Sequence, residues 1–178
     1  MNKILIFILT SIILFFSYGI YTNLDKKSMK SKRIACQEQT ITFESIYDIS
    51  KISKGQKLFS SKNYVIKSDI KYSIFMPTVL KEFYNVEKAD TILKSSIPVK
   101  DIIKTDEKIV LDYYIYENDK EDKNKKSPKA KLYAGYLLFE FKLDGQIIYK
   151  IQTDYMKIDG SDIENRMKCI IKSFLTIK

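Results

Sequence analysis

The chain of 178 residues contains no histidine, five glycines and two cysteines. Without histidine it lacks the usual general base near neutral pH and the commonest metal ligand. This absence excludes Ser-His-Asp and Cys-His catalytic groups, and two distant cysteines cannot form a zinc site. The glycines do not cluster, so a glycine-rich phosphate loop is missing as well. We therefore predict a non-enzymatic protein with no metal ion and no cofactor.

The N-terminal segment is the strongest signal of destination. Lys3 precedes an uncharged run over residues 4–22, and the small residues Ser17 and Gly19 follow its most apolar part. This order is typical of a secretory signal peptide, with cleavage after Gly19. An uncut membrane anchor is the alternative, because the run just reaches the length that a bilayer requires; a buried soluble helix is a third interpretation. Residues 1–22 thus predict an exported protein, periplasmic or otherwise extracytoplasmic, anchored to the inner membrane if the segment is not cleaved.

The charges that follow this run favour the opposite orientation. Five basic residues, opposed by Asp25 alone, come soon after it: Lys26, Lys27, Lys30, Lys32 and Arg33. Positive flanks tend to stay cytoplasmic. A cytoplasm-facing, membrane-tethered adaptor that binds anionic lipid is therefore an alternative function.

The remaining chain divides into a basic linker over residues 23–38 and one globular domain over residues 39–178, a usual domain size. The formal net charge is +9, which favours anionic partners such as lipid headgroups or acidic glycan. Nucleic acid is an unlikely partner, because arginine is scarce and no RNA-binding motif is present. The abundance of Lys, Ile, Asn and Tyr resembles the coding bias of an AT-rich bacterium.

The two cysteines, Cys36 and Cys169, allow one disulfide in an oxidising compartment. It would join the linker to the C-terminal helix. In a reducing compartment the same residues would remain two thiols.

Several segments have strand or helix periodicity. The segment 107–117 places Ile109, Leu111, Tyr113 and Ile115 on one face of a half-buried strand. Similar alternation predicts a strand over residues 69–76, and Pro77 then starts a short helix with apolar residues on one face. Residues 39–67 are ambiguous.

Residues 131–157 form the clearest unit, a long hairpin around Asp144-Gly145. Odd-numbered apolar residues face the core in both strands. A three-residue turn that includes Leu143 keeps them together and pairs Phe141 with Ile147, whereas a two-residue turn places them on opposite faces. We therefore predict the three-residue turn, with Phe139 opposite Tyr149 and Leu137 opposite Ile151.

A terminal helix follows, with a capping box from Ser161 to Glu164. Its apolar stripe should cover the odd-numbered face of the hairpin; the stripe comprises Ile163, Met167, Ile170, Ile171, Phe174 and Leu175. The predicted fold is α+β: an antiparallel sheet with a long C-terminal hairpin, a C-terminal helix packed on one face, and the N-terminal apolar signal or anchor helix before it. The order of elements is loosely similar to small periplasmic accessory subunits of bacterial transport and assembly machines.

Two residue sets are candidates for function. Tyrosines crowd the central strands and, together with lysine, suit a surface that binds glycan, lipid or protein: Tyr113, Tyr114, Tyr116, Tyr133 and Tyr136. Asp112, Glu140 and Asp154 lie on polar strand faces, and a close pair of them could serve a secreted carboxylate-based hydrolase. We favour a bacterial cell-envelope protein that acts as a binding or accessory subunit with a protein partner, and keep the hydrolase as an alternative.

Overall fold

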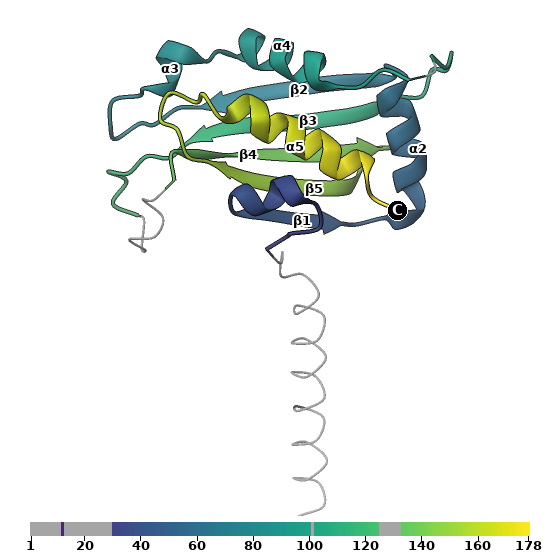
Figure 1. The fold of residues 1–178 in the computed structure, drawn as a ribbon, viewed down its shortest axis with the longest axis horizontal. Coiled ribbons are helices and arrows are strands. Elements are labelled where there is room, and N and C mark those ends of the chain that lie inside the picture. Colours follow the sequence, from purple (N-terminus) through teal and green to yellow (C-terminus); the bar gives the residue numbers. More distant parts are fainter. Residues whose placement is uncertain (1–11, 13–29, 101, 125–132) are drawn as a thin grey trace, which may run out of the picture.

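The computed structural model describes residue 12 and residues 30–100, 102–124 and 133–178. Within them the fold is α+β, with one five-stranded mixed sheet and helices beside it (Figure 1). In chain order the elements are η1 (Ala35–Gln39), β1 (Thr42–Ile46), α2 (Ile49–Ser60), β2 (Tyr64–Lys71), α3 (Leu80–Phe83), α4 (Val86–Ser96), β3 (Ile109–Glu117), β4 (Gly135–Leu143), β5 (Gln146–Tyr155) and α5 (Ile163–Leu175).

The strand order is β1-β5-β4-β3-β2, and the pair β2–β3 is parallel. The predicted all-antiparallel sheet is therefore wrong at this edge. The reason is the connection: α3 and α4 lie between β2 and β3, and a long helical crossover returns the chain in the same direction. The other neighbouring pairs, including β1 with β5, are antiparallel.

The hairpin of β4 and β5 forms, but with a different turn from the predicted one. Leu143 pairs with Gln146, so Asp144 and Gly145 make a two-residue turn, with φ of 53° and 74°. This left-handed pair is typical of a type I′ hairpin. The register shifts between Phe141 and Lys142, so that Phe141 lies opposite Tyr149. This bulge restores the odd-numbered face beyond the turn.

As a consequence, every predicted pair in the hairpin is displaced by two residues. Phe139 lies opposite Ile151, and Leu137 lies opposite Thr153. From Phe141 and Tyr149 to the far ends of the strands, the predicted odd-numbered residues are nevertheless buried, because the displacement is even. Next to the turn the prediction is wrong, because Ile148 is buried in place of Ile147.

Helix α5 covers this face, and the predicted apolar stripe is buried except for partly exposed Leu175. The capping box does not form: the helix begins at Ile163, and Asp162 instead accepts from the backbone N–H groups of Met156 and Lys157. Asp48 caps α2 by accepting from Ser50 N–H, within the segment that the sequence left ambiguous.

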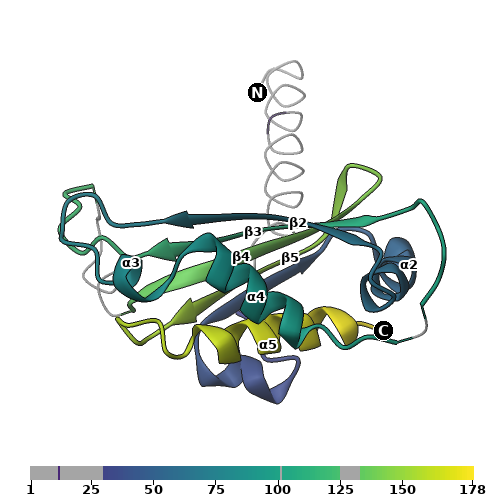
Figure 2. The same cartoon turned by 90° about the horizontal axis from the view of Figure 1, so that it is seen from above.

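The core lies between the sheet and its helices. Phe174 of α5 stacks on Phe141 of β4 at 4.0 Å between ring centroids, and Phe59 of α2 contacts both rings edge-on. Figure 2 shows η1, α2, α4 and α5 on one side of the sheet. The even-numbered positions of β3 and β4 point to the other side, which we call the open face; their side chains are half-buried.

Among the described residues, no helix combines the length and apolarity that a membrane crossing requires. The predicted signal or anchor, residues 1–22, lies outside the described residues except for Ile12.

Candidate functional site

Three of the five predicted tyrosines meet on the open face. Tyr116 stacks on Tyr136 with 4.8 Å between ring centroids, and Tyr114 contacts Tyr136 edge-on at 5.9 Å. Lys71 of β2 places its Nζ 4.3 Å from the Tyr114 ring centroid, a cation–π contact. We call Tyr114, Tyr116 and Tyr136 the tyrosine cluster.

The other two predicted tyrosines lie elsewhere. Tyr113 is buried on the helix-covered face, where it stacks on Phe139 and donates a hydrogen bond to Asp90, so it belongs to the core and not to a binding surface. Tyr133 precedes β4 and is half-buried. Burial, followed by the nearby Asp154 carboxylate and Tyr116, raises the pKa of Tyr133.

Paired charges occupy the open face beside the tyrosine cluster. Asp112 and Glu140 are cross-strand partners, and Lys142 bridges them with N–O distances of 2.7 and 3.0 Å. Lys150 binds Glu140 from the other side at 2.8 Å. Burial opposes ionisation of Glu140, but the hydrogen bonds from the two lysines outweigh it and lower its pKa. Glu140 is thus held ionised within a ladder of ion pairs.

The third predicted carboxylate, Asp154, is not brought to the other two. It lies opposite Tyr136 in the register, whereas Glu140 lies opposite Lys150. Its side chain is buried, and this burial raises its pKa to about 6. Of the three predicted carboxylates, Asp112 and Glu140 therefore lie close together on one face, where Lys142 bridges them, and Asp154 lies apart. No group of three or more acidic or cysteine side chains within the described ranges could hold a metal ion.

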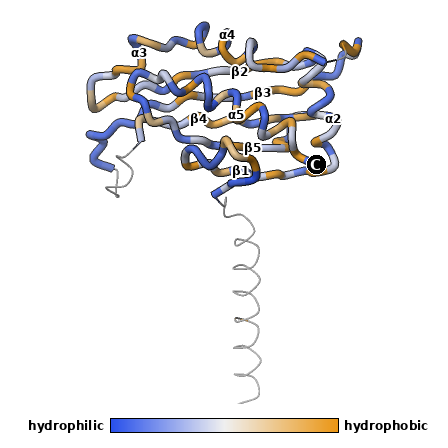
Figure 3. The backbone as a smooth tube through the Cα atoms, in the orientation of Figure 1, coloured by the Kyte–Doolittle hydropathy of each residue, from blue (hydrophilic) through white to orange (hydrophobic). Residues whose placement is uncertain are grey.

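Beside the tyrosine cluster lies a loop that the sequence did not single out, residues 72–79 between β2 and α3. We call it the tip loop. The predicted strand over residues 69–76 is wrong beyond Lys71, where β2 ends. Two apolar residues of this segment instead face solvent, because Ile74 is 86% exposed and Phe75 is 57% exposed. Figure 3 colours the backbone by hydropathy, including this loop between β2 and α3. The helix expected after Pro77 is only the single turn α3, and α4 begins separately at Val86.

Two buried carboxylates hold the tip loop in place. Glu117, the last residue of β3, accepts hydrogen bonds from the N–H groups of Val79 and Leu80, both at 2.9 Å, and from that of Ser73 at 3.0 Å. Asp119 accepts from the N–H groups of Ile74 and Phe75 at 2.7 and 2.6 Å.

The charge of Glu117 is stabilised by these donors. Burial opposes its ionisation, but the hydrogen bonds from Leu80, Thr78, Ser73 and Val79 prevail and lower its pKa. Buried carboxylates are costly unless they are satisfied in this way. The tip loop is therefore rigidly anchored by its backbone while its apolar side chains remain outside, and ordered loops of this kind commonly carry function.

The predicted cysteine pair lies in a third place, on the helix-covered side near β1. Cys36 in η1 and Cys169 in α5 are joined by a disulfide, with 5.8 Å between their Cα atoms. Residues 30–39, which the sequence assigned largely to a linker, thus pack against the end of the sheet. Lys30 forms an isolated bridge with Phe43 at the outer edge of β1.

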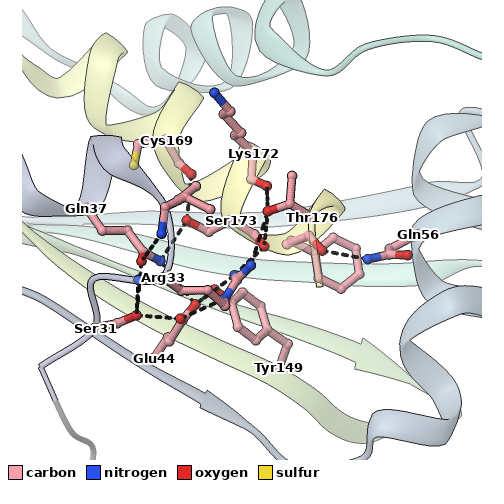
Figure 4. Close-up of polar contacts among 12 residues, drawn as sticks. Ser31, Arg33, Gln37, Glu44, Gln56, Tyr149, Cys169, Lys172, Ser173 and Thr176 are labelled. Atoms are coloured by element: carbon pink, nitrogen blue, oxygen red, sulfur yellow. Dashed lines mark hydrogen bonds and ion pairs between the residues drawn. The ribbon is translucent and has the colours of Figure 1, made fainter. Parts of the chain in front are cut away.

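A polar network lies beside the disulfide (Figure 4). Arg33 binds both carboxylate oxygens of Glu44 at 3.0 Å, and Tyr149 donates to Glu44 at 2.6 Å. Arg33 also donates to the backbone carbonyl of Ser173 at 2.6 Å, and the Gln37 amide reaches both Glu44 and Ser173. We call Arg33, Gln37, Glu44, Tyr149 and Ser173 the clasp. Burial opposes ionisation of Glu44, yet the bonds from Arg33, Ser31 and Tyr149 lower its pKa.

Comparison with known proteins gives little. No family model matches the chain, and no curated protein matches it. Among solved structures, a PelC dodecamer from Paraburkholderia phytofirmans is similar, with a TM-score of 0.40 and 11% sequence identity; the match covers 78% of this chain and 99% of that chain.

Proposed function

We propose that this chain is a non-enzymatic binding or accessory subunit of a bacterial cell-envelope system, exported from the cytoplasm, which holds a protein partner on its open face. The observation that carries the proposal is the tyrosine cluster. Tyr116 and Tyr136 present stacked rings on a sheet face that η1, α2, α4 and α5 all leave uncovered. Tyrosine combines a large apolar area with a polar end and few rotatable bonds, which suits a protein interface.

The surrounding charges favour a protein partner as well. Asp112, Lys142, Glu140 and Lys150 already satisfy one another across the open face. A partner that covers them needs no counter-charge for each one. Leu138 lies between the paired charges and the aromatic rings in the same face, opposite Tyr114 in the register, and adds an apolar centre.

The disulfide supports the proposed compartment. Cystines are rare in the bacterial cytoplasm and persist in the periplasm and outside the cell. Cys36 and Cys169 are separated by 133 residues and meet with their sulfur atoms in bonding contact, which suits an exported protein better than the cytoplasm-facing, lipid-binding alternative.

A test of the compartment uses the full chain with a C-terminal reporter that is active only outside the cytoplasm, together with N-terminal sequencing of the mature protein. We expect an active reporter, and Cys36 and Cys169 that react with an alkylating agent only after reduction. An inactive reporter together with two freely reactive thiols would favour the cytoplasmic adaptor.

A test of the open face compares how much partner the parent chain, a tyrosine variant and a control variant each capture by crosslinking in cells. A photo-crosslinking residue at Leu138 should capture one discrete envelope protein, and Tyr136→Ala with Tyr116→Ala should reduce that capture by about ten-fold or more, as for interface hot spots. The matched control is Tyr47→Ala, because Tyr47 is 60% exposed but lies beyond the end of β1, away from the cluster. Equal losses in both variants would contradict the proposed surface.

A further inference from the structure

Exposed apolar side chains gather at one end of the sheet, on three separate segments. β2, β3 and β5 all run toward this end, because β2 is parallel to β3 and both β3 and β5 are antiparallel to β4. The tip loop therefore lies beside α3 and the segment after β5 (Figure 1). The exposed apolar residues here are Ile74, Phe75, Phe83, Met156 and Ile158.

These three segments are braced against one another. Gly160, in the connection from β5 to α5, packs so closely on Leu80 and Tyr84 that a side chain at this position would clash with both. The backbone N–H of Lys120, after β3, donates to the sulfur of Met76 in the tip loop at 3.3 Å. The apolar side chains are thus presented on a common, braced support.

Several backbone N–H groups of the tip loop already have hydrogen-bond acceptors within the protein. A chain that enters an apolar phase needs partners for its N–H groups, since each unsatisfied group is costly there. Asp119 accepts hydrogen bonds from the N–H groups of Ile74 and Phe75, whose side chains are exposed, and Glu117 accepts from those of Val79 and Leu80 behind them. The exposed side chains could therefore leave water while the polar groups at their base remain bonded.

Lysines flank the apolar residues. Lys71, Lys81 and Lys157 are exposed and lie directly next to the three segments. Lys88 reaches over the Tyr84 ring, at 4.6 Å from its centroid, and donates to the backbone carbonyl of Phe83. Of the carboxylates at this end, Glu82 and Asp159 are exposed among these lysines, whereas Glu117 and Asp119 are buried in the tip loop contacts. The four lysines and a chain charge of +9 favour an anionic surface.

The shape of the end favours a bilayer over a protein groove. Ile74 is 86% exposed and Ile158 is 53% exposed, on different segments. A protein partner would need a separate matching pocket for each protruding side chain, whereas the headgroup boundary of a bilayer accommodates isolated apolar groups and attracts the lysines beside them.

We infer that this end of the sheet is a membrane-docking surface, in which Ile74 and Phe75 enter the interface of an anionic lipid bilayer and the flanking lysines bind its headgroups. The inference is independent of the protein partner proposed for the open face.

The chain contains no tryptophan, so a single indole reports directly on this docking. The experiment uses the full-length Phe75→Trp variant, reconstituted with vesicles of phosphatidylcholine alone or of an equimolar mixture of phosphatidylcholine and phosphatidylglycerol. We expect a blue shift of the emission, and several-fold stronger quenching by brominated lipid, in the anionic vesicles. Added salt should weaken both effects.

The matched control is Ile102→Trp, because Ile102 is 73% exposed and lies between α4 and β3, at the opposite end of the sheet. Both variants carry the same N-terminal segment, so a membrane anchor alone affects them equally. Equal quenching of the two variants, or none in Phe75→Trp, would overturn the inference. Ile74→Trp is the second reporter if Phe75→Trp does not give the circular dichroism spectrum of the parent chain.

Discussion

The clasp and the tip loop both use a carboxylate that is buried or half-buried to hold a segment with little regular structure, but the two held segments differ in what they cover. In the clasp, Glu44 binds the guanidinium of Arg33, and the segment it fixes covers the core, with Gln37 only 1% exposed. In the tip loop, Glu117 receives only uncharged donors, and the segment it fixes leaves Ile74 outside. The clasp fixes a segment that covers the core, whereas the tip loop keeps apolar side chains exposed and requires burial of the Glu117 charge.

This difference predicts that the two regions can be loosened separately. They lie at different places on the sheet and no residue belongs to both, so their effects on the free energy of unfolding should add.

The largest effect is expected from removing the disulfide. For Cys36→Ala with Cys169→Ala, the loss of a cross-link over so long a loop should lower the free energy of unfolding by about 2–5 kcal/mol. Denaturant unfolding of the full chain measures the loss. Amide exchange should accelerate in residues 31–39 and remain slow in the tip loop; acceleration in both would show that the two regions are one cooperative unit.

The next effect is expected from Glu117→Gln, which replaces one accepting oxygen by an amide that itself donates. Depending on which oxygen is replaced, either the N–H groups of Val79 and Leu80 or the N–H group of Ser73 lose their acceptor. The free energy of unfolding should fall by about 2–3 kcal/mol. We expect new proteolytic cleavage within residues 73–79 while the disulfide and residues 31–39 stay protected. Glu121→Gln is the control, because Glu121 is an exposed carboxylate a few residues along the chain.

The smallest effect, and the only stabilising one, is expected from Asp154→Asn. The folded pKa of Asp154 is about 6, above its ordinary value of 3.8, because burial disfavours the charge. The folded state then binds more protons than the unfolded state between about pH 4 and 6, so Asp154 makes stability fall as the pH rises through this window. At pH 7 the substitution should stabilise by about 1–2 kcal/mol, with no gain at pH 3.5 or below.

Glu44 and Glu117 should show the opposite dependence. Their folded pKa values are lowered, so their stabilising contributions are present above the ordinary pKa of glutamate and are lost as the pH falls below it. A stability profile of the Asp154→Asn variant that still declined from pH 4 to 6 would contradict the assignment of that decline to Asp154.

The elements that the sequence predicted well are those in which one face is buried along the whole length. β3 alternates buried and half-buried residues throughout, and Ile109, Leu111 and Ile115 are all in the core as expected. The same is true of the stripe of α5. In these elements the apolar pattern repeats often enough to distinguish the two-residue period of a strand from the roughly 3.6-residue period of a helix.

The errors fall where the deciding contact is distant in sequence. Ile74 and Met76 alternate with polar or exposed neighbours as strand residues do, but Glu117 and Asp119, more than 40 residues later, bend the chain away from the sheet. Likewise, the phase of β4 and β5 favoured a three-residue turn, because the bulge that leaves Ile148 of β5 without an opposite residue cannot be seen in the alternation of residues. The candidate surface was half predicted: Tyr114, Tyr116 and Tyr136 meet, whereas Tyr113 turns inward and the tip loop was missed.

By itself, the sequence determined the α+β class, the buried faces of β3, β4 and α5, and the absence of histidine chemistry, because side-chain identity and local periodicity need no knowledge of distant neighbours. Only the tertiary structure decided the parallel direction of β2, the register of β5 and the outward position of Ile74 and Phe75. These depend on where hydrogen-bond acceptors such as Glu117 arrive in space, and that position is set by the packing of the whole sheet.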